Sequence, residues 1–250
     1  MLKIDYACGT HTGLVREDNE DAYFADPKLG LWIVADGMGG HQAGEVASGI
    51  VIQEIPLSVQ QGDGLPEAIE MAHLMIQMAS EQIEGPGHMG STVVALRLNG
   101  LHYHIAWVGD SRAYLWNGEE LRRLTLDHSY VQMLLDMGMI MEDEVYTHPS
   151  RNVISQGLGV GGINGNAVKV DEVEGELAVG ETLLLCSDGL TGEMRDHLIA
   201  EVLAATRDNK ARLDQLIEAS LAFGGIDNVT VILLTPMEEA APPGSKPPKG

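Results

Sequence analysis

The chain has 250 residues, of which 44% are apolar, and this size and composition suit one large globular domain. Acidic residues outnumber basic ones by 37 to 15, and the formal charge of −22 argues against nucleic acid and anionic membranes as partners. The chain shows no signal-peptide pattern and no apolar run long enough to cross a bilayer. Its two cysteines, Cys8 and Cys186, are expected to be buried free thiols, so we expect a cytoplasmic protein.

The N-terminal region combines an expected strand over residues 2–8 with a polar, charged segment over residues 9–24. Arg16 in this segment offers a planar fork of donors that suits phosphate oxygens. Glu20 and Asp21 follow shortly after and can reach a metal ion directly or through its bound water. A solvated polar turn is the simpler explanation when this segment is considered alone.

The run at 31–34 predicts a short buried strand, because a continuous apolar run without helical periodicity suits a sheet covered on both faces. Asp36 follows where this strand reaches the surface, and three of the next four residues are glycines that permit tight turns. An aspartate and a glycine after a strand usually form only a turn. A functional role for Asp36 is therefore supported only if other strands of the chain also end in an aspartate.

Three further aspartates stand at the ends of expected strands. Asp110 and Asp188 follow apolar runs, and Asp227 precedes a strand expected over residues 229–234. If these strand ends meet at one edge of a sheet, their carboxylates and that of Asp36 form one acidic cluster. Like charges this close require a cation, protonation or a large repulsive penalty, and a bound metal ion is the simplest solution.

Two helices are expected after the glycine cluster. Apolar residues over 46–51 mark one helical face, and Pro56 is expected to end this helix. A second helix is expected to begin near Pro66, where apolar residues spaced by three and four from Ile69 to Ile83 form one stripe. Both helices would then pack as a layer on a sheet.

The central part of the chain predicts an antiparallel β-meander over residues 91–98, 101–108 and 113–116. Its turns are the Asn-Gly pairs at 99–100 and 117–118, which are strong hairpin signals.

The pattern then loosens between residues 127 and 162, apart from a short helix around residues 131–135. A long irregular segment in a compact domain is often a lid or a substrate-contacting flap, although a variable surface insertion explains it equally well. Arg151 is the residue of this segment that we select as a candidate for substrate contact.

The last third is expected to contain a strand over 182–186, an amphipathic helix over 213–221 and the closing strand. We expect one domain over residues 1–236. The Pro-rich tail, residues 237–250, has no apolar face to bury and is expected to be disordered.

Carboxylates of this kind suit the hard cations Mg²⁺ and Mn²⁺ rather than zinc. Two such ions about 3.5–4 Å apart, bridged by one carboxylate, support an in-line displacement at phosphorus. Asp36 is the natural bridge, because Gly37 lets a backbone carbonyl approach the same ion, and Arg16 would hold the non-reacting phosphate oxygens. The chain has neither a nucleotide-cradling loop nor a Gly-x-Ser-x-Gly elbow, which leaves a two-metal phosphohydrolase as the favoured function.

Eight short motifs follow one another along the chain: GLVREDNEDA at 13–22, ADGMGG at 35–40, MGST at 89–92, VGDSRAY at 108–114, LTLDHS at 124–129, HPSRNVISQGLG at 148–159, CSDGLT at 186–191 and GGIDNVTVI at 224–232. As an ordered set they resemble the metal-dependent protein phosphatase family of type 2C (PPM), specifically its bacterial serine/threonine phosphatase branch. The similarity extends from about residue 6 to residue 235. Each motif alone is moderately specific, whereas the ordered set is highly specific.

The resemblance implies an α+β fold, a four-layer α-β-β-α sandwich of two central antiparallel sheets flanked by helix pairs, with a flap at about 127–162. It implies hydrolysis of phosphoserine and phosphothreonine in proteins by attack of a metal-bridging hydroxide, with Mn²⁺ or Mg²⁺. The implied partners are phosphorylated proteins, in particular a bacterial serine/threonine kinase and its substrates, and we expect a monomer.

The resemblance also assigns roles to residues. Arg16 resembles the phosphate-binding arginine, and Asp110 matches an aspartate that, with Asp188, holds a weaker third ion in bacterial members. The implied ligands of the two catalytic ions are Asp36 as the bridge, the Gly37 carbonyl, Asp188 and Asp227 at the first ion, and Glu20 and Asp21 near the second ion through water.

One position departs from the animal branch of the family. A histidine proposed as general acid follows the Asp-Gly pair there, whereas this chain has Met38, as bacterial members commonly do. The proton for the leaving group must then come from a metal-bound water or from another residue. His41 is close in sequence, and its role stays open.

Two other classes of function compete with a phosphatase. A pseudophosphatase would keep the fold as a regulatory binding module, but the main expected ligands and Arg16 are all present. A non-catalytic acidic protein that binds divalent ions would leave Arg16 and the strand-end aspartates without a reason. Metal-dependent turnover of a phosphopeptide that is absent in Asp36→Asn separates the phosphatase from both.

Overall fold

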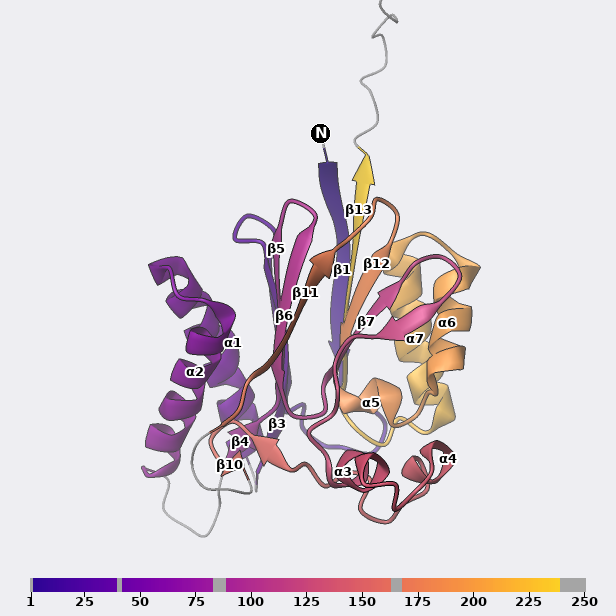
Figure 1. Ribbon diagram of the computed structural model, residues 1–250. Coiled ribbons are helices and arrows are strands. Elements are labelled where there is room, and N and C mark those ends of the chain that lie inside the picture. The colour runs from indigo at the N-terminus through magenta and orange to yellow at the C-terminus, as the bar shows by residue number, and fades with distance from the viewer. Residues whose placement is uncertain (1, 40–41, 83–88, 163–167, 239–250) are drawn as a thin grey trace, which may run out of the picture.

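The computed structural model describes residues 2–39, 42–82, 89–162 and 168–238, and it arranges them in four layers (Figure 1). Helices α1 (Ala43–Gln61) and α2 (Leu65–Ser80) cover one sheet, and α6 (Asp196–Ala205) and α7 (Asn209–Phe223) cover the other. The shorter helices α3 (Tyr130–Asp136), α4 (Glu142–Val145) and α5 (Asp188–Thr191) lie at one end of the sandwich. The expected four-layer α+β fold is confirmed.

Both large sheets are antiparallel. One has the spatial order β11 (Asp171–Glu176), β6 (His102–Val108), β5 (Val93–Asn99), β3 (Leu31–Met38) and β2 (Asp21–Asp26), with β4 (Gly90–Ser91) paired to β3. The other has the order β1 (Leu2–His11), β13 (Val229–Glu238), β12 (Thr182–Cys186), β7 (Arg112–Trp116) and β8 (Leu121–Arg123). A small ribbon pairs β9 (Gln156–Gly157) with β10 (Gly161–Gly162).

The apolar residues form three cores, one between each pair of neighbouring layers. Strand β3 shows why its run is continuously apolar. Leu31 and Ile33 point into the core beneath α1 and α2, whereas Trp32 and Val34 point into the core between the sheets. Because both faces of this strand are buried, its residues do not alternate between apolar and polar, which agrees with the prediction of a strand covered on both faces.

Helix α1 corrects one expectation, because it continues through Pro56 to Gln61. Proline inside a helix removes one backbone hydrogen bond and costs about 3 kcal/mol. The buried face formed by Val51, Ile55 and Val59 extends past the proline against β3 and α2. Burying these side chains, worth about 1.5–3 kcal/mol each, outweighs that cost.

Helix α2 begins at Leu65 with Pro66 in its first turn, close to the predicted start. Its buried stripe includes Ile69, Ala72 and Ile76, as expected, and Ile83 lies outside the described residues.

The predicted three-stranded meander is wrong at its third strand. The hairpin β5–β6 forms across Asn99-Gly100, but β7 belongs to the other sheet, where it pairs with β12 and β8. The chain changes sheets just after β6, at Gly109, whose φ of +106° favours glycine. Asn117-Gly118 joins β7 to β8 as a hairpin, as this turn predicts. The pairing of β7 with β12 instead of β6 was not predicted.

Three C-terminal elements follow the prediction, whereas α5 and α6 were not predicted. Strand β12 has the predicted bounds, α7 contains the expected buried face, and β13 continues to Glu238, two residues beyond the expected domain limit. Both cysteines are free, and Cys186 is buried whereas Cys8 is half-buried. Residues 239–250 of the tail lie outside the described residues. Among the described helices, none combines the length and the apolar character needed to span a membrane.

Candidate active site

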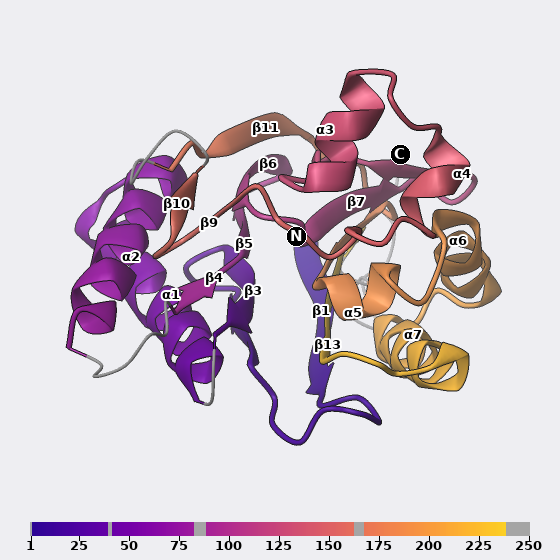
Figure 2. The ribbon, with the colours of Figure 1, turned by 90° about the horizontal axis from the view of Figure 1, so that it is seen from below.

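The four strand-end aspartates meet at one end of the sandwich, which Figure 2 views directly. Asp36 lies near the end of β3, Asp110 follows β6, Asp188 opens α5 after β12, and Asp227 precedes β13. They therefore come from both sheets rather than from one sheet edge. Together they line a cavity of about 250 Å³, whose other walls include Arg16, Glu20, Gly37, Thr92, Asn152 and Asn228.

Asp36 is fixed by the backbone on both sides. Its N–H donates to Thr92 Oγ1 at 3.2 Å, and its carbonyl accepts from the Thr92 N–H at 2.8 Å and from Ser91 Oγ at 3.1 Å. Gly37 allows no side chain, because a Cβ there would lie 2.0 Å from the Gly44 carbonyl oxygen. The Gly37 N–H donates to the Glu20 carbonyl at 3.1 Å, so the end of β3 is held against both α1 and the charged N-terminal loop.

Close backbone contact also brings Asp188 and Asp227 together. A Cβ on Gly189 would lie 1.9 Å from the Asn228 carbonyl oxygen, so α5 and the start of β13 approach each other as only glycine allows. Beneath them, Ser187 Oγ donates to Asp21 Oδ2 at 2.7 Å and accepts from the Thr230 N–H at 3.0 Å.

The loop that carries Arg16 is tied to the same region by Asn228. The Asn228 amide group donates to the carbonyls of Thr12 and Asp18 at 2.8 and 3.0 Å, and its oxygen accepts from the Glu20 N–H at 2.8 Å. Arg16 Nη2 donates to Asp227 Oδ2 at 2.7 Å, and this ion pair raises the pKa of Arg16. The predicted phosphate-binding arginine therefore contacts a predicted metal ligand directly.

Four aspartates of this region, Asp21, Asp36, Asp110 and Asp188, have raised pKa values. Burial raises the pKa of Asp36, and the charges of Asp21, Asp188, Asp110 and Asp227 raise it further. Burial raises the pKa of Asp110, and the charges of nearby carboxylates raise it further. Burial and the charge of Asp227 likewise raise the pKa of Asp188. For Asp21, burial outweighs the hydrogen bonds from Ser187 and Thr230 and raises the pKa to about 7.

These residues fit a hard divalent cation. The oxygens Asp21 Oδ1 and Asp188 Oδ1 are buried with no hydrogen-bond partner, which costs free energy unless a cation compensates. The donors are carboxylates, the ligands that Mg²⁺ and Mn²⁺ prefer. Within the described residues, no three His, Cys, Asp or Glu side chains already form a complete ligand group. The carboxylates lie close enough to raise one another's pKa, but no three of those described converge on a point where one ion would sit.

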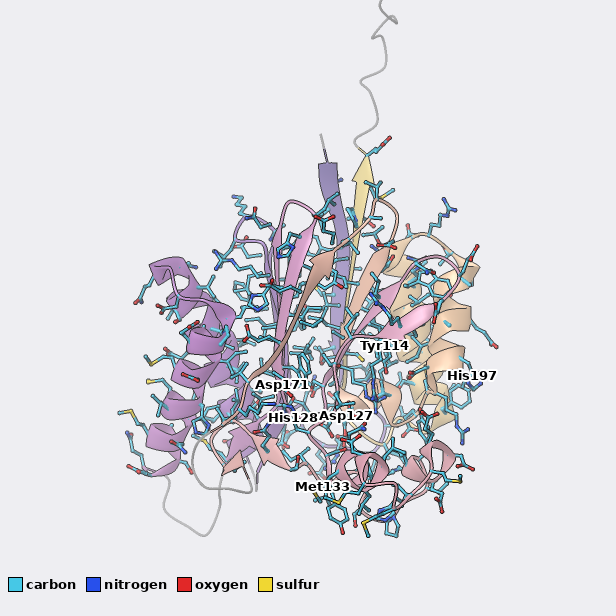
Figure 3. All side chains as sticks on the ribbon, viewed as in Figure 1. Tyr114, Asp127, His128, Met133, Asp171 and His197 are labelled. Carbon is cyan, nitrogen blue, oxygen red and sulfur yellow. The ribbon has the colours of Figure 1, made fainter. Side chains whose placement is uncertain are left out.

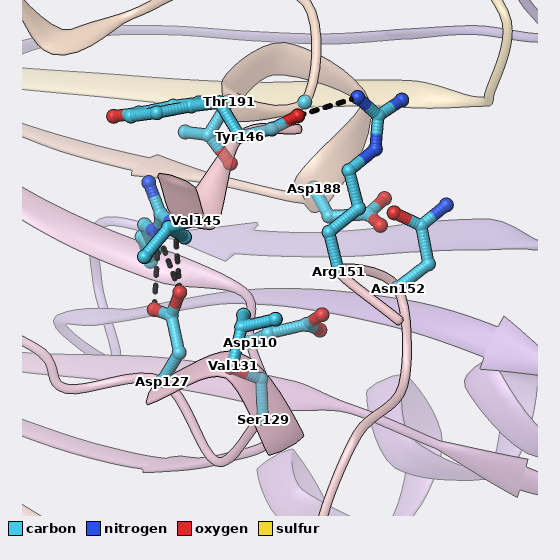
Figure 4. A pocket seen from close by; sticks show the side chains of 12 residues that line it. Asp110, Asp127, Ser129, Val131, Val145, Tyr146, Arg151, Asn152, Asp188 and Thr191 are labelled. Atoms are coloured by element: carbon cyan, nitrogen blue, oxygen red, sulfur yellow. Dashed lines mark hydrogen bonds and ion pairs between the residues drawn. The ribbon is translucent and has the colours of Figure 1, made fainter. Parts of the chain in front are cut away.

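Most of the predicted site residues surround this one cavity. Asp21, which is paired with Asp36 in the β2–β3 register, is buried and hydrogen-bonded to Ser187 and does not line this cavity, and Arg151 lies in an adjacent pocket between the flap and the body. Figure 4 shows Arg151 and Asn152 beside Asp188 in that pocket, where Arg151 Nη1 donates to the Tyr146 carbonyl at 3.0 Å. His41 lies outside the described residues.

Sequence reasoning missed three residues that shape the site. Asn152 lines both the aspartate cavity and the flap pocket, and Asn228 organises the Arg16 loop. Asp127 accepts from Arg112 Nη2 at 2.6 Å, forming a buried ion pair beside Asp110 (Figure 4). All three residues lie within the eight motifs of the sequence, which could have pointed to them. Only the fold shows where each of their side chains lies.

Comparison with known proteins agrees with this geometry. Residues 10–132 match the family model described as protein phosphatase 2C. The serine/threonine phosphatase stp of Listeria innocua is 35% identical over 238 residues, which cover 90% of this chain and 93% of that protein. The serine/threonine protein phosphatase PstP of Mycobacterium tuberculosis is 36% identical over 238 residues, which cover 93% of this chain and 45% of that protein. The chain thus spans about half the length of this mycobacterial relative.

Solved structures agree as well. A crystal structure of the catalytic domain of the serine/threonine protein phosphatase PstP in complex with two manganese ions is 34% identical. It matches with a TM-score of 0.82 over 95% of this chain and 100% of that one. The four-layer sandwich is therefore the fold of known protein phosphatases.

Proposed function

The chain belongs to the protein phosphatase 2C family, and on that basis we propose that it is a metal-dependent protein serine/threonine phosphatase. The observation that supports this most strongly is the gathering of aspartates from both sheets and one arginine around a single cavity. The proposed reaction is hydrolysis of phosphoserine and phosphothreonine in proteins with Mn²⁺ or Mg²⁺.

The proposal assigns the carboxylates to metal binding. In it, Asp36 would help to hold both ions, and the buried Asp21 would act through water. The remaining ligands in the proposal are the Gly37 carbonyl, Asp188 and Asp227 at the first ion, Glu20 near the second ion, and Asp110 with Asp188 at a weaker third ion. When bound, such ions lower the pKa of coordinated water and offset the charge that develops at phosphorus.

Two arginines bind the substrate in this proposal. Arg16 is about half exposed and next to Asp227, so its guanidinium can turn toward the non-reacting oxygens of a phosphate in the cavity. Arg151 contacts the phosphoprotein from the flap side, next to Asn152. No side chain of the general-acid type stands at Met38, so the proton for the leaving group comes from elsewhere in the site.

The biological setting belongs to the same proposal. The enzyme would act on phosphorylated proteins, oppose a bacterial serine/threonine kinase, and work as a monomer. Two free cysteines separated in the fold are compatible with a reducing compartment, and we propose the cytoplasm.

Phosphate release from a phosphothreonine peptide tests the function. We expect turnover with Mn²⁺ or Mg²⁺, none in EDTA, and a loss of at least about a hundredfold in Asp227→Ala, since one ligand of the catalytic ions is removed. Thermal unfolding establishes that the variant is folded. A folded wild-type protein with no turnover with either metal would favour the alternative, a pseudophosphatase acting as a regulatory binding module.

A further inference from the structure

Large apolar side chains are exposed directly beside the candidate active site. Leu14 and Val15, which precede Arg16, are 65% and 64% exposed, and Ile226, which precedes Asp227, is 50% exposed. Phe223, at the end of α7, is 55% exposed. We call these four residues the Leu14 patch.

The backbone beneath this patch is tightly held. The Leu14 N–H donates to the Gly225 carbonyl at 2.7 Å, which joins the β1–β2 loop to the α7–β13 loop. Gly13 has a φ of +83°, and a Cβ on it would lie 2.3 Å from the Asp227 carbonyl oxygen. Asn228 fixes the same loop through two further carbonyls. The apolar side chains are therefore presented by ordered backbone, which reduces the entropy lost when a ligand binds.

The patch is continuous with the aspartate cavity and lies away from the flap. Arg16 and Asp227 line the cavity, and their ion pair at 2.7 Å connects the two loops that carry the patch. In Figure 2 these two loops lie side by side, and α5, which begins with Asp188, lies between them and helices α3 and α4. Leu14 and Val15 immediately precede Arg16, and Ile226 precedes Asp227, so a side chain one or two residues from a phosphate held at Arg16 can reach the patch, since an extended chain advances about 3.3–3.6 Å per residue.

Acidic residues lie beside the patch. Glu17 and Asp18 are exposed in the same loop, and Glu193 accepts a hydrogen bond from the Ile226 N–H. An exposed apolar patch with a polar rim marks a binding surface, and this rim repels acidic partners.

We propose that the Leu14 patch binds a large apolar side chain adjacent to the phosphorylated residue of protein substrates, and that the acidic rim favours basic residues farther along. This inference rests on the proposed function and names the substrate class of that same site. Arg16 receives the phosphate, and Leu14, Val15 and Ile226 remove the neighbouring apolar side chain from water.

Two phosphothreonine peptides test the inference. They are identical except that leucine flanks the phosphothreonine on both sides in one, and serine in the other. With Mn²⁺, the wild-type protein is expected to show a kcat/KM about tenfold higher for the leucine peptide. Leu14→Ser and Ile226→Ser are each expected to reduce this ratio toward one. Leu74→Ser, which changes a 50% exposed leucine on the outer face of α2, is the matched control and keeps the ratio.

The possible results distinguish failure of the substrate inference from failure of the proposed function. No turnover of either peptide or of p-nitrophenyl phosphate, in folded protein with metal, would contradict the proposed function itself. Equal kcat/KM for both peptides, or a preference that persists in folded Leu14→Ser and Ile226→Ser, would overturn the substrate inference alone. A dimer in sedimentation that Ile226→Ser dissociates, with no change in peptide preference, would assign the patch to self-association and also overturn it.

Discussion

Asp36 lies among several other carboxylates. Its backbone N–H and carbonyl are hydrogen-bonded to Thr92, while burial and the charges of four other aspartates oppose the ionisation of its carboxylate. A group whose ionised form is this unfavourable lowers the stability of the folded protein unless a cation compensates it. Such a residue is retained for function at a cost in stability.

Replacing that charge should therefore stabilise the metal-free protein. In EDTA at neutral pH, Asp36→Asn is expected to increase the free energy of unfolding by about 1–2 kcal/mol, because one repelling carboxylate is removed. Urea unfolding of both proteins measures the difference. Asp143→Asn, an exposed change on α4, is the control and should have almost no effect. A destabilised Asp36→Asn would show that the aspartate cluster is not repulsive.

The residues of the site were predicted more completely than their arrangement. Asp36, Asp110, Asp188 and Asp227 follow from strand ends, which are visible as apolar runs. The buried position of Asp21 and the Arg16–Asp227 ion pair depend on contacts across up to 211 residues of sequence, which no local pattern records.

At the scale of elements, His128 links the flap to the sheet next to the site. The Gly109 N–H donates to His128 Nδ1 at 3.1 Å, Gln156 Nε2 lies 2.8 Å from the same nitrogen, and His128 Nε2 lies 3.1 Å from Asp171 Oδ2 (Figure 3). An acceptor Nδ1 requires the proton on Nε2, so the ring is neutral. Burial lowers the pKa of His128, although the Asp171 carboxylate opposes this, as does Asp127, while Lys169 adds to it.

The stability that His128 contributes depends on pH. Because the folded pKa of His128 lies below the unfolded value of about 6.5, its contribution to stability is present above that pH and is lost as the pH falls through the folded pKa. Asp171 stays ionised in this range, because hydrogen bonds from Lys169 and His128 outweigh burial and lower its pKa.

Acidification should therefore loosen the base of the flap. Between pH 7 and pH 5, amide hydrogen exchange around residues 128–130 and 154–157, corrected for the intrinsic pH effect, is expected to increase several-fold. His128→Asn should remove most of this acid dependence, whereas His197→Asn, at an exposed position of α6, should keep it. Equal protection at both pH values in the wild-type protein would show that His128 does not anchor the flap.

Elements with a strong local signal were predicted, and those decided by tertiary contacts were not. The β5–β6 hairpin and α2 have clear turn and stripe patterns. Helix α1 passes Pro56 because its buried face continues, and β7 joins the other sheet because the chain turns at Gly109. Strand β11 was not predicted, since its sequence DEVEGE alternates acidic residues with only one large apolar side chain.

At the scale of the whole molecule, the formal charge of −22 influences how readily a phosphorylated partner associates with the protein. The substrate carries phosphate charge of the same sign, so approach is opposed except where the substrate supplies basic residues. The fold as a whole was predicted from the ordered motifs, which span both sheets, whereas composition alone indicated only a globular domain.

Salt should consequently change peptide selectivity. Raising ionic strength from about 0.05 to 0.5 M is expected to decrease kcat/KM for a basic phosphopeptide and to increase it for an acidic one, because screening weakens both attraction and repulsion. A neutral phosphopeptide of the same length is the control. The same direction of change for the acidic and basic peptides would contradict this electrostatic account.

The central claim is that carboxylates from two sheets form one metal centre, and anomalous diffraction from crystals containing Mn²⁺ tests it most directly. We predict two manganese peaks in the aspartate cavity, about 3.5–4 Å apart and bridged by Asp36, with Asp188 and Asp227 on one ion. Crystals of folded protein with no manganese in this cavity, or with manganese held by other residues, would contradict the account.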